Sequence, residues 1–137
     1  MLDNKLPGLE RLRVLLVEDD MFAQRLAASV LRQLGVANLT VVKDGQAAID
    51  LLGTTEIQFD LIDSDWNMPK VTGLDLLKHV RKTWENMPFL MLTGNANEDF
   101  VIAARQNKVD AYVIKPFSAG QLQQKLAVMF NIKLPGP

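Results

Sequence analysis

Residues 59–69, FDLIDSDWNMP, decide the fold class of this 137-residue chain. Phe59–Ser64 is a short run with three large apolar residues, Phe59, Leu61 and Ile62, which predicts a buried β-strand. Asp65 follows this run, and the Asn and Pro after it favour a turn. Beyond the turn, GLDLLKHVRKT at residues 73–83 carries its apolar residues at helical spacing. A buried strand, a turn and a helix together form one βα unit of a parallel sheet.

The same unit recurs on both sides of this stretch. We expect strands at Leu12–Val17, Leu39–Val42, Phe59–Ser64, Phe89–Thr93 and Ala111–Ile114, and helices at about Phe22–Leu34, Gly45–Leu52, Gly73–Thr83, Glu98–Gln106 and Ala119–Phe130. Gly35 suits a helix C-cap, and Asn97 and Ser118 suit N-caps. Five strands alternating with five helices predict a doubly wound α/β domain with helices on both faces of the sheet.

The composition is that of an ordinary globular domain, with 48% hydrophobic residues, 23% charged residues and no cysteine. The net charge of -1 gives no general attraction to nucleic acid or acidic lipid. No apolar run is long enough for a signal peptide or a membrane span, so we expect a cytoplasmic protein without nucleic-acid or membrane partners. We assign residues 1–10 to an N-terminal extension, 11–131 to the domain and 132–137 to a tail.

Polar residues end four of the predicted strands. Ligands of open parallel sheets bind beyond the carboxyl ends of the strands. Those ends carry Glu18-Asp19-Asp20, Asp65, Thr93 and Lys115. Close carboxylates repel one another unless a cation neutralises them, and Mg²⁺ suits such oxygen ligands because it keeps waters and accepts phosphate oxygens.

Each of these residues taken alone is more often a helix cap or a solvated loop end. Together they predict phosphoryl chemistry. Asp65 can attack a phosphoryl group, while Lys115 and the metal balance charge and Thr93 hydrogen-bonds the product.

Four segments also resemble a known family. VLLVEDD, LIDSDWNMPKVTGLDLLKHVR, FLMLTGNA and AYVIKPF are similar to the receiver domains of two-component response regulators. SDWNMP and KPFSAGQLQQKLAVMF resemble the single-domain chemotaxis type, and the resemblance covers about Arg11 to Phe130. It implies a flavodoxin-like sheet in the order 2-1-3-4-5.

The resemblance also implies a role for each site residue. Asp65 would be the phosphoacceptor, and Mg²⁺ would be held by Glu18, Asp19, Asp65 and the backbone carbonyl of Asn67. Thr93 and Lys115 would bind the phosphoryl group. Tyr112 would be a rotamer switch that turns from an exposed to a buried position on phosphorylation.

These roles imply a stand-alone signalling receiver. It would accept a phosphoryl group from a histidine kinase or a small phosphodonor, and would catalyse its own phosphorylation and dephosphorylation without being an enzyme for another substrate. Its signal would pass to a protein target through the face made by the fourth helix, the fifth strand and the fifth helix, where Tyr112, Phe117 and Gln121 lie.

Several residues have a second interpretation or depart from the family. Asp63 stands where the family is usually apolar, and an unpaired buried carboxylate there would be costly. It could be paired with a cation, partly protonated, or closer to the surface. We expect Trp66 and Met68 to be partly exposed loop residues, and His79 to be a solvated surface histidine.

Two other functions compete with the receiver. A phosphatase of the haloacid-dehalogenase type would use Asp63 as nucleophile and Asp65 as general acid, which LIDSDWN fits loosely. That interpretation leaves Glu18 and Asp19 without a role. The second alternative is a receiver-fold module that binds partners without being phosphorylated.

Overall fold

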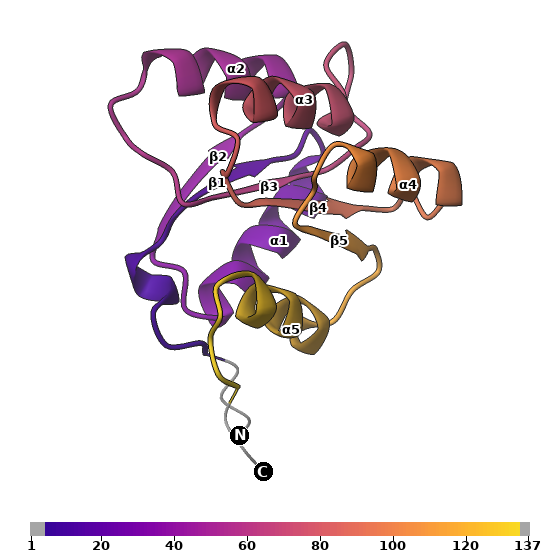
Figure 1. Ribbon diagram of the computed structural model, residues 1–137. Helices are drawn as coiled ribbons and strands as arrows, with labels where there is room; N and C mark the ends of the chain where they lie inside the picture. The colour runs from indigo at the N-terminus through magenta and orange to yellow at the C-terminus, as the bar shows by residue number, and fades with distance from the viewer. Residues whose placement is uncertain (1–4, 135–137) are drawn as a thin grey trace.

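A computed structural model describes residues 5–134 of the chain. Its centre is one parallel sheet of five strands in the order β2-β1-β3-β4-β5, as predicted (Figure 1). The strands are β1 (Arg13–Val17), β2 (Asn38–Val42), β3 (Leu61–Ser64), β4 (Phe89–Thr93) and β5 (Ala111–Ile114). Strand order reverses at β1, which pairs with β2 on one side and β3 on the other.

Helices cover both faces of the sheet (Figure 1). They are α1 (Met21–Gln33), α2 (Gly45–Thr54), α3 (Gly73–Thr83), α4 (Glu98–Gln106) and α5 (Ala119–Met129). One core lies beneath α1 and α5 and includes Leu31 and Leu122. The other lies beneath α2, α3 and α4 and includes Leu52 and Leu76. The predicted doubly wound architecture is therefore confirmed.

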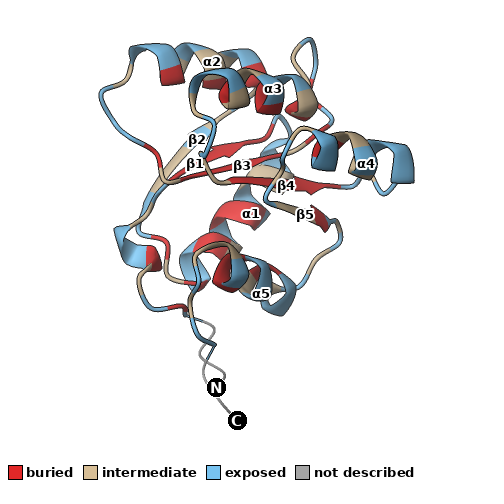
Figure 2. Cartoon of the chain, viewed as in Figure 1, coloured by how far each residue is buried: buried red, intermediate tan, exposed pale blue. Residues whose placement is uncertain are grey.

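The three inner strands, β1, β3 and β4, are largely buried on both sides because helices cover both faces of the sheet. In β1, Val14 and Leu16 enter the α1/α5 core, whereas Leu15 and Val17 enter the opposite core. Strands β3 and β4 are buried along their whole length (Figure 2). The two-residue alternation of a strand thus feeds two separate cores.

Local capping explains why the helices begin and end where the sequence predicts. Ser118 forms a capping box with Gln121 at the start of α5, and Asn97 caps α4. Thr72 and Asp75 form a second capping box at the start of α3. Gly35 follows α1 with a φ of 120°, a conformation that disfavours other residues.

Part of the N-terminal extension packs against the domain. Leu6 and Leu9 are buried in the α1/α5 core, and the Leu6 amide donates to the Leu34 carbonyl at 2.8 Å. A short 3₁₀ helix, Leu9–Arg11, leads into β1. Residues 1–4 of the extension and 135–137 of the tail lie outside the described part. Among the described residues, no helix is both long and apolar enough to cross a membrane.

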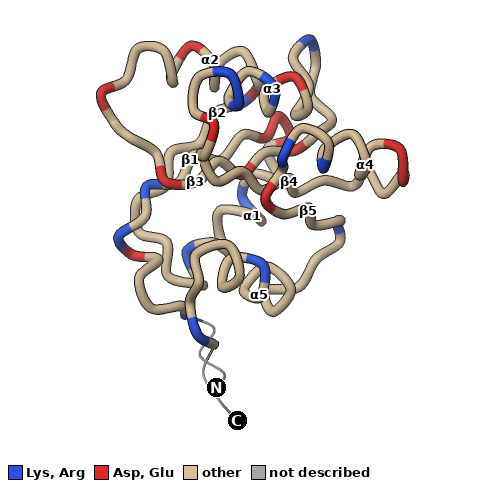
Figure 3. The backbone as a smooth tube through the Cα atoms, viewed as in Figure 1, with Lys and Arg blue, Asp and Glu red and all other residues tan. Residues whose placement is uncertain are grey.

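Charged residues of both signs are spread along the chain, in keeping with a net charge of -1 (Figure 3). In this view no single face gathers the Lys and Arg residues. Local groupings of charge therefore carry more information than the overall balance.

Candidate functional site

The candidate site lies at the carboxyl edge of the sheet, next to the reversal of strand order. Glu18 and Asp19 follow β1, and Asp65 follows β3. The Asp65 amide donates to the Val17 carbonyl at 3.0 Å, which continues the pairing of β1 with β3 to this point. The Glu18 amide likewise donates to the Val42 carbonyl of β2. Backbone pairing therefore fixes where these carboxylates emerge.

Glu18, Asp19 and Asp65 form one carboxylate cluster. An oxygen from each lies within 4.8 Å of an oxygen from the others. Glu18 is buried and Asp19 is exposed, so the cluster runs from the interior to solvent. Burial raises the pKa of Glu18 to about 7, although hydrogen bonding to Lys115 opposes this rise. A group of this kind needs positive charge nearby to hold all three carboxylates ionised.

Lys115 supplies one positive charge to the cluster. Its Nζ atom lies 2.9 Å from Glu18 Oε1 and 3.8 Å from Asp65 Oδ2. The Lys115 amide donates to the Thr93 carbonyl, which extends the pairing of β4 and β5. The Lys115–Pro116 peptide bond that follows is cis.

The backbone on either side of Asp65 is closely packed. Asp65 Oδ1 accepts a hydrogen bond of 2.7 Å from the Trp66 amide. A Cβ atom at Gly73 would lie only 2.2 Å from the Asp65 carbonyl oxygen. Only glycine fits there, so the start of α3 can approach the Asp65 loop. Asn67, whose carbonyl was predicted as a metal ligand, is an exposed residue of this loop.

Asp20 belongs to the same acidic run but has another function. Its Oδ2 atom accepts a 2.8 Å hydrogen bond from the Ala23 amide and caps the N-terminus of α1. The Asp20 carboxylate therefore serves as a helix cap. This is the role that such residues most often have when each is taken alone.

Thr93 and Tyr112 meet at the backbone of Asn95. Thr93 is fully buried, and its hydroxyl oxygen accepts a 3.2 Å hydrogen bond from the Asn95 amide. The Tyr112 hydroxyl donates to the Asn95 carbonyl at 2.6 Å. Burial raises the pKa of Tyr112, with Asp65 adding to the rise. The sequence did not indicate Asn95, because only its backbone atoms contact Thr93 and Tyr112.

Tyr112 does not occupy the exposed starting position that we expected of a rotamer switch. Its ring is half-buried, and its hydroxyl already has a protein acceptor. The physical reason is that the Asn95 carbonyl satisfies a phenol that would otherwise lose water on burial. In this structure Tyr112 is therefore held by the backbone of the loop before α4.

The predicted partner face includes residues of different exposure. Phe117 is half-buried and packs against the α1/α5 core, whereas Gln121 is exposed. The Gln121 side chain accepts from the Ser118 amide in the capping box, so it also serves the helix.

Asp63 is the most unusual residue near the site. It is fully buried, and neither carboxylate oxygen has a hydrogen-bond partner among the described residues. Burial raises its pKa to about 7, while Lys115 acts in the opposite direction and Glu18 and Asp65 add to the rise. Two of the three alternatives left open are excluded, because Asp63 is not near the surface and forms no ion pair within residues 5–134.

Trp66 and Met68 are buried, so the expectation of partial exposure was wrong. Both pack in the core beneath α2, α3 and α4. The Trp66 ring also lies against Phe100 of α4, with 4.9 Å between ring centroids. Because α4 crosses near the loop after Asp65, side chains of that loop gain cover that the sequence does not reveal.

The site has the features that a divalent cation requires. Its three carboxylates offer the hard oxygen ligands that Mg²⁺ prefers. The buried Oε2 atom of Glu18 has no hydrogen-bond partner within the described chain. A cation, or a water bound to one, would satisfy that oxygen. The residues present therefore fit the metal that the sequence predicts.

A parallel sheet whose carboxyl edge carries a carboxylate cluster and a lysine, next to the reversal of strand order, has the arrangement of a ligand-binding α/β domain. Over residues 14–127 the chain matches the family described as the response regulator receiver domain. It is 38% identical to the chemotaxis protein CheY of Pseudomonas aeruginosa over 122 residues, covering 88% of this chain and 97% of that protein.

One further relative and one solved structure are also similar to this chain over most of its length. The chemotaxis protein CheY-3 of Vibrio cholerae is 37% identical over 124 residues, covering 89% of this chain and 94% of the relative. The solved structure of the Mn²⁺-bound form of response regulator Rcp1 is 28% identical, with a TM-score of 0.76 over 91% of this chain and 99% of Rcp1. The chain belongs to the response regulator receiver family and is CheY-like.

Proposed function

We propose that this protein is a phosphorylation-controlled signalling receiver that accepts a phosphoryl group on Asp65 with the help of Mg²⁺. The observation that carries the proposal is the convergence of Glu18, Asp19, Asp65 and Lys115 at one edge of the sheet. The carboxyl ends of three strands, β1, β3 and β5, bring these residues together, and the family match is independent of that geometry.

In the proposed reaction, a carboxylate oxygen of Asp65 attacks the phosphorus atom of a phosphohistidine or a small phosphodonor. The new P–O bond forms while the bond from phosphorus to the donor nitrogen or oxygen breaks, and the donor leaves with that electron pair. Lys115, 3.8 Å from Asp65 Oδ2, is placed to balance charge on the transferred oxygens.

The metal would be held by Glu18, Asp19, Asp65 and the carbonyl of Asn67. When bound, Mg²⁺ supplies electrostatic stabilisation of the charge that develops on the phosphoryl oxygens. Glu18 and Lys115, 2.9 Å apart, keep each other oriented at the inner side of the site. The Mn²⁺-bound state named for Rcp1 supports a divalent cation in this kind of domain.

The donor is proposed to be a histidine kinase, and the receiver to pass its signal to a protein target. We place the protein in the cytoplasm, with the α4, β5 and α5 face as its output surface. Tyr112, Phe117 and Gln121 lie on that face. Support comes from the chemotaxis names of the relatives and from Tyr112, which joins β5 to the loop before α4.

The haloacid-dehalogenase alternative is disfavoured by burial. Its nucleophile would be Asp63, which is fully buried, so no phosphodonor can reach it. The Asp65 side chain, by contrast, retains 11% exposure and borders the exposed Asp19.

A direct test of the proposed function is to incubate the protein with acetyl phosphate with and without Mg²⁺. One phosphoryl group should be gained only with the metal, as measured by intact-mass spectrometry.

Magnesium binding should depend on Asp19. Asp19→Ala removes a direct ligand, and we expect Mg²⁺ affinity to fall by more than about tenfold, with a smaller loss for Glu18→Ala, which we expect to act through water. Trp66 fluorescence can follow the titration, because the Trp66 amide bonds Asp65. The Trp84→Phe background removes the only other tryptophan. Titration curves unchanged in both variants would contradict the metal site.

Thr93 should couple the phosphoryl group to the output face. A phosphoryl group that accepts a hydrogen bond from the Thr93 hydroxyl would pull Thr93 from its contact with Asn95, whose carbonyl holds Tyr112. Thr93→Ala should remain phosphorylatable but lose this coupling. NMR shifts of Tyr112 and Phe117 on adding beryllofluoride, a phosphoryl mimic, measure it.

Thr93→Ser is the matched control for this experiment, because it keeps the hydroxyl. It should retain the beryllofluoride-induced shifts that Thr93→Ala loses. Equal shifts in Thr93→Ala and wild type, with the mimic demonstrably bound, would show that the coupling runs elsewhere.

A further inference from the structure

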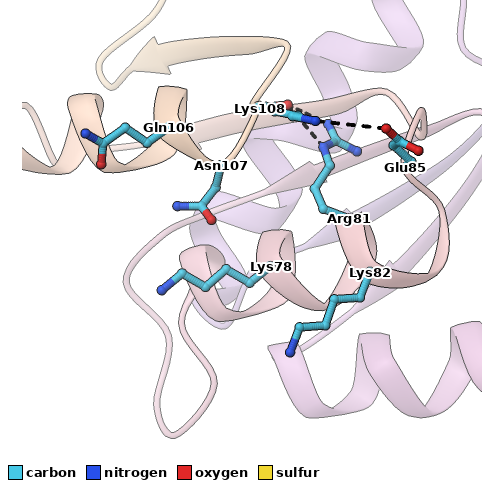
Figure 4. Close-up of a pocket in the computed structure, with 7 residues that line it drawn as sticks. All are labelled: Lys78, Arg81, Lys82, Glu85, Gln106, Asn107 and Lys108. Carbon is cyan, nitrogen blue, oxygen red and sulfur yellow. Dashed lines mark hydrogen bonds and ion pairs between the residues drawn. The ribbon is translucent and has the colours of Figure 1, made fainter.

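A basic cavity lies at the opposite edge of the sheet from the carboxylate cluster. It has a volume of about 420 Å³ and lies between the C-terminal ends of α3 and α4 (Figure 4). These helices lead into β4 and β5, so the cavity faces the starts of those strands. It therefore has no residue in common with the site around Asp65.

Arg81 makes the framework of this cavity. Its guanidinium donates to the Met87 carbonyl at 2.6 Å, to the Lys108 carbonyl and to Asp110 Oδ2 at 3.0 Å. Asp110 in turn accepts from the Phe89 amide at 2.8 Å. Arg81 thereby ties the end of α3 to the segments that enter β4 and β5. The Arg81 guanidinium is therefore bonded to groups within the protein, and these bonds hold the cavity wall in place.

Three lysines around the cavity are not used in this way. Lys78 and Lys82, both exposed, project from α3 and form no hydrogen bond or ion pair with the described residues (Figure 4). Within residues 5–134 the Lys108 side chain has only a 3.9 Å ion pair with Glu85, and both side chains of that pair are more than 70% exposed. Such a pair contributes little. The cavity therefore carries an excess of positive charge in a chain whose net charge is -1.

Groups other than these lysines donate to several carbonyls at the ends of α3 and α4. At the end of α4 the Asn107 side chain donates to the Ala103 carbonyl at 2.8 Å, and the Val109 amide donates to the Ala104 carbonyl at 3.0 Å. At the end of α3 the Trp84 amide donates to the Val80 carbonyl. These three carbonyls therefore have donors other than the lysine side chains. The ammonium groups remain available to a ligand.

We propose that this cavity is a binding site for small anions that carry two or more phosphate groups. Its volume falls within the range of small-molecule sites. Lysine binds phosphate as a point charge, and three lysines from two helix ends can reach several phosphate oxygens at once. Lys78 and Lys82 can swing over the cavity at low cost because no existing bond must break. A polyphosphate concentrates charge within this volume better than the spaced carboxylates of a peptide.

Titration with tripolyphosphate tests the proposal. The Asp65→Asn protein, without Mg²⁺, keeps the experiment independent of phosphorylation at the carboxylate site. We expect saturable NMR shifts at the amides of Asn107 and Lys108, with a Kd on the order of 1 mM that weakens as salt is added. Lys78→Gln with Lys82→Gln should weaken binding at least about fivefold.

The matched control removes two exposed lysines on the other side of the molecule, Lys125→Gln with Lys133→Gln. Binding by this control should equal that of the parent. Three outcomes would overturn the proposal: no saturable shift at Asn107 and Lys108, equal weakening in both double variants, or binding of a glutamate-rich peptide without binding of tripolyphosphate. The last would identify the cavity as a contact for an acidic protein segment.

Discussion

Replacing Asp65 with Asn is expected to abolish phosphorylation, whereas Asp63→Asn is expected to retain it. Asp65 lies beside Asp19 and Lys115 with part of its carboxylate exposed. An asparagine amide has nearly the same shape but is not a nucleophile for phosphorus. With acetyl phosphate and Mg²⁺, the wild type and Asp63→Asn should each gain one phosphoryl group. Asp65→Asn should gain none.

Asp63→Asn is the control for this experiment because it alters a carboxylate on β3 only two residues before Asp65. Asp63 is fully buried, so a phosphodonor cannot reach it. Phosphorylation that disappeared with Asp63 and persisted with Asp65→Asn would support the phosphatase-like alternative. Persistence in both variants would place the acceptor at a third residue.

Replacing Asp63 with valine should stabilise the protein, and the gain should grow with pH. Burial raises the Asp63 pKa to about 7, from an ordinary value of 3.8. The folded state therefore holds a proton that the unfolded state releases above the ordinary value. Through Asp63, wild-type stability is lost as pH rises from about 4 to about 7. The Asp63→Val variant would lack this part of the loss and keep the part that the raised pKa of Glu18 causes. At pH 8 we expect a gain of roughly 3 kcal/mol, and a smaller gain at pH 5.

Urea unfolding in metal-free buffer, followed by tryptophan fluorescence, measures both gains. The exposed carboxylate of Asp50 on α2 provides a control, since Asp50→Asn should change stability little at either pH. An Asp63→Val protein that is less stable than wild type at pH 8 would show that Asp63 has a stabilising partner. A gain that does not vary with pH would show that packing, rather than ionisation, is the cause.

The fold was largely predictable because its signals are local. Buried strands such as Phe89–Thr93 and helices such as Gly73–Thr83 have the bounds that their apolar pattern predicts. The start of β3 is an exception, because Phe59 and Asp60 precede the paired residues. The convergence of Glu18, Asp19, Asp65 and Lys115 was also predictable, since carboxyl ends of parallel strands share one edge.

Features that depend on packing between distant elements could not be predicted. Trp66 is buried partly because Phe100 of α4 covers it, and nothing in the local sequence indicates that contact. The inward position of Tyr112 depends on a backbone carbonyl of Asn95, which carries no side-chain signal. The burial of Leu6 and Leu9 depends on the end of α1. The basic cavity likewise requires two helix ends to meet.

The most direct test of the central claim is to locate the phosphoryl group on the wild-type protein. After reaction with acetyl phosphate and Mg²⁺, borohydride reduces an aspartyl phosphate to homoserine, and tandem mass spectrometry of the peptides identifies the converted position. We predict homoserine at position 65, and none when Mg²⁺ is replaced by a chelator. Homoserine at position 63, or no conversion in a protein that has gained a phosphoryl group, would contradict the account.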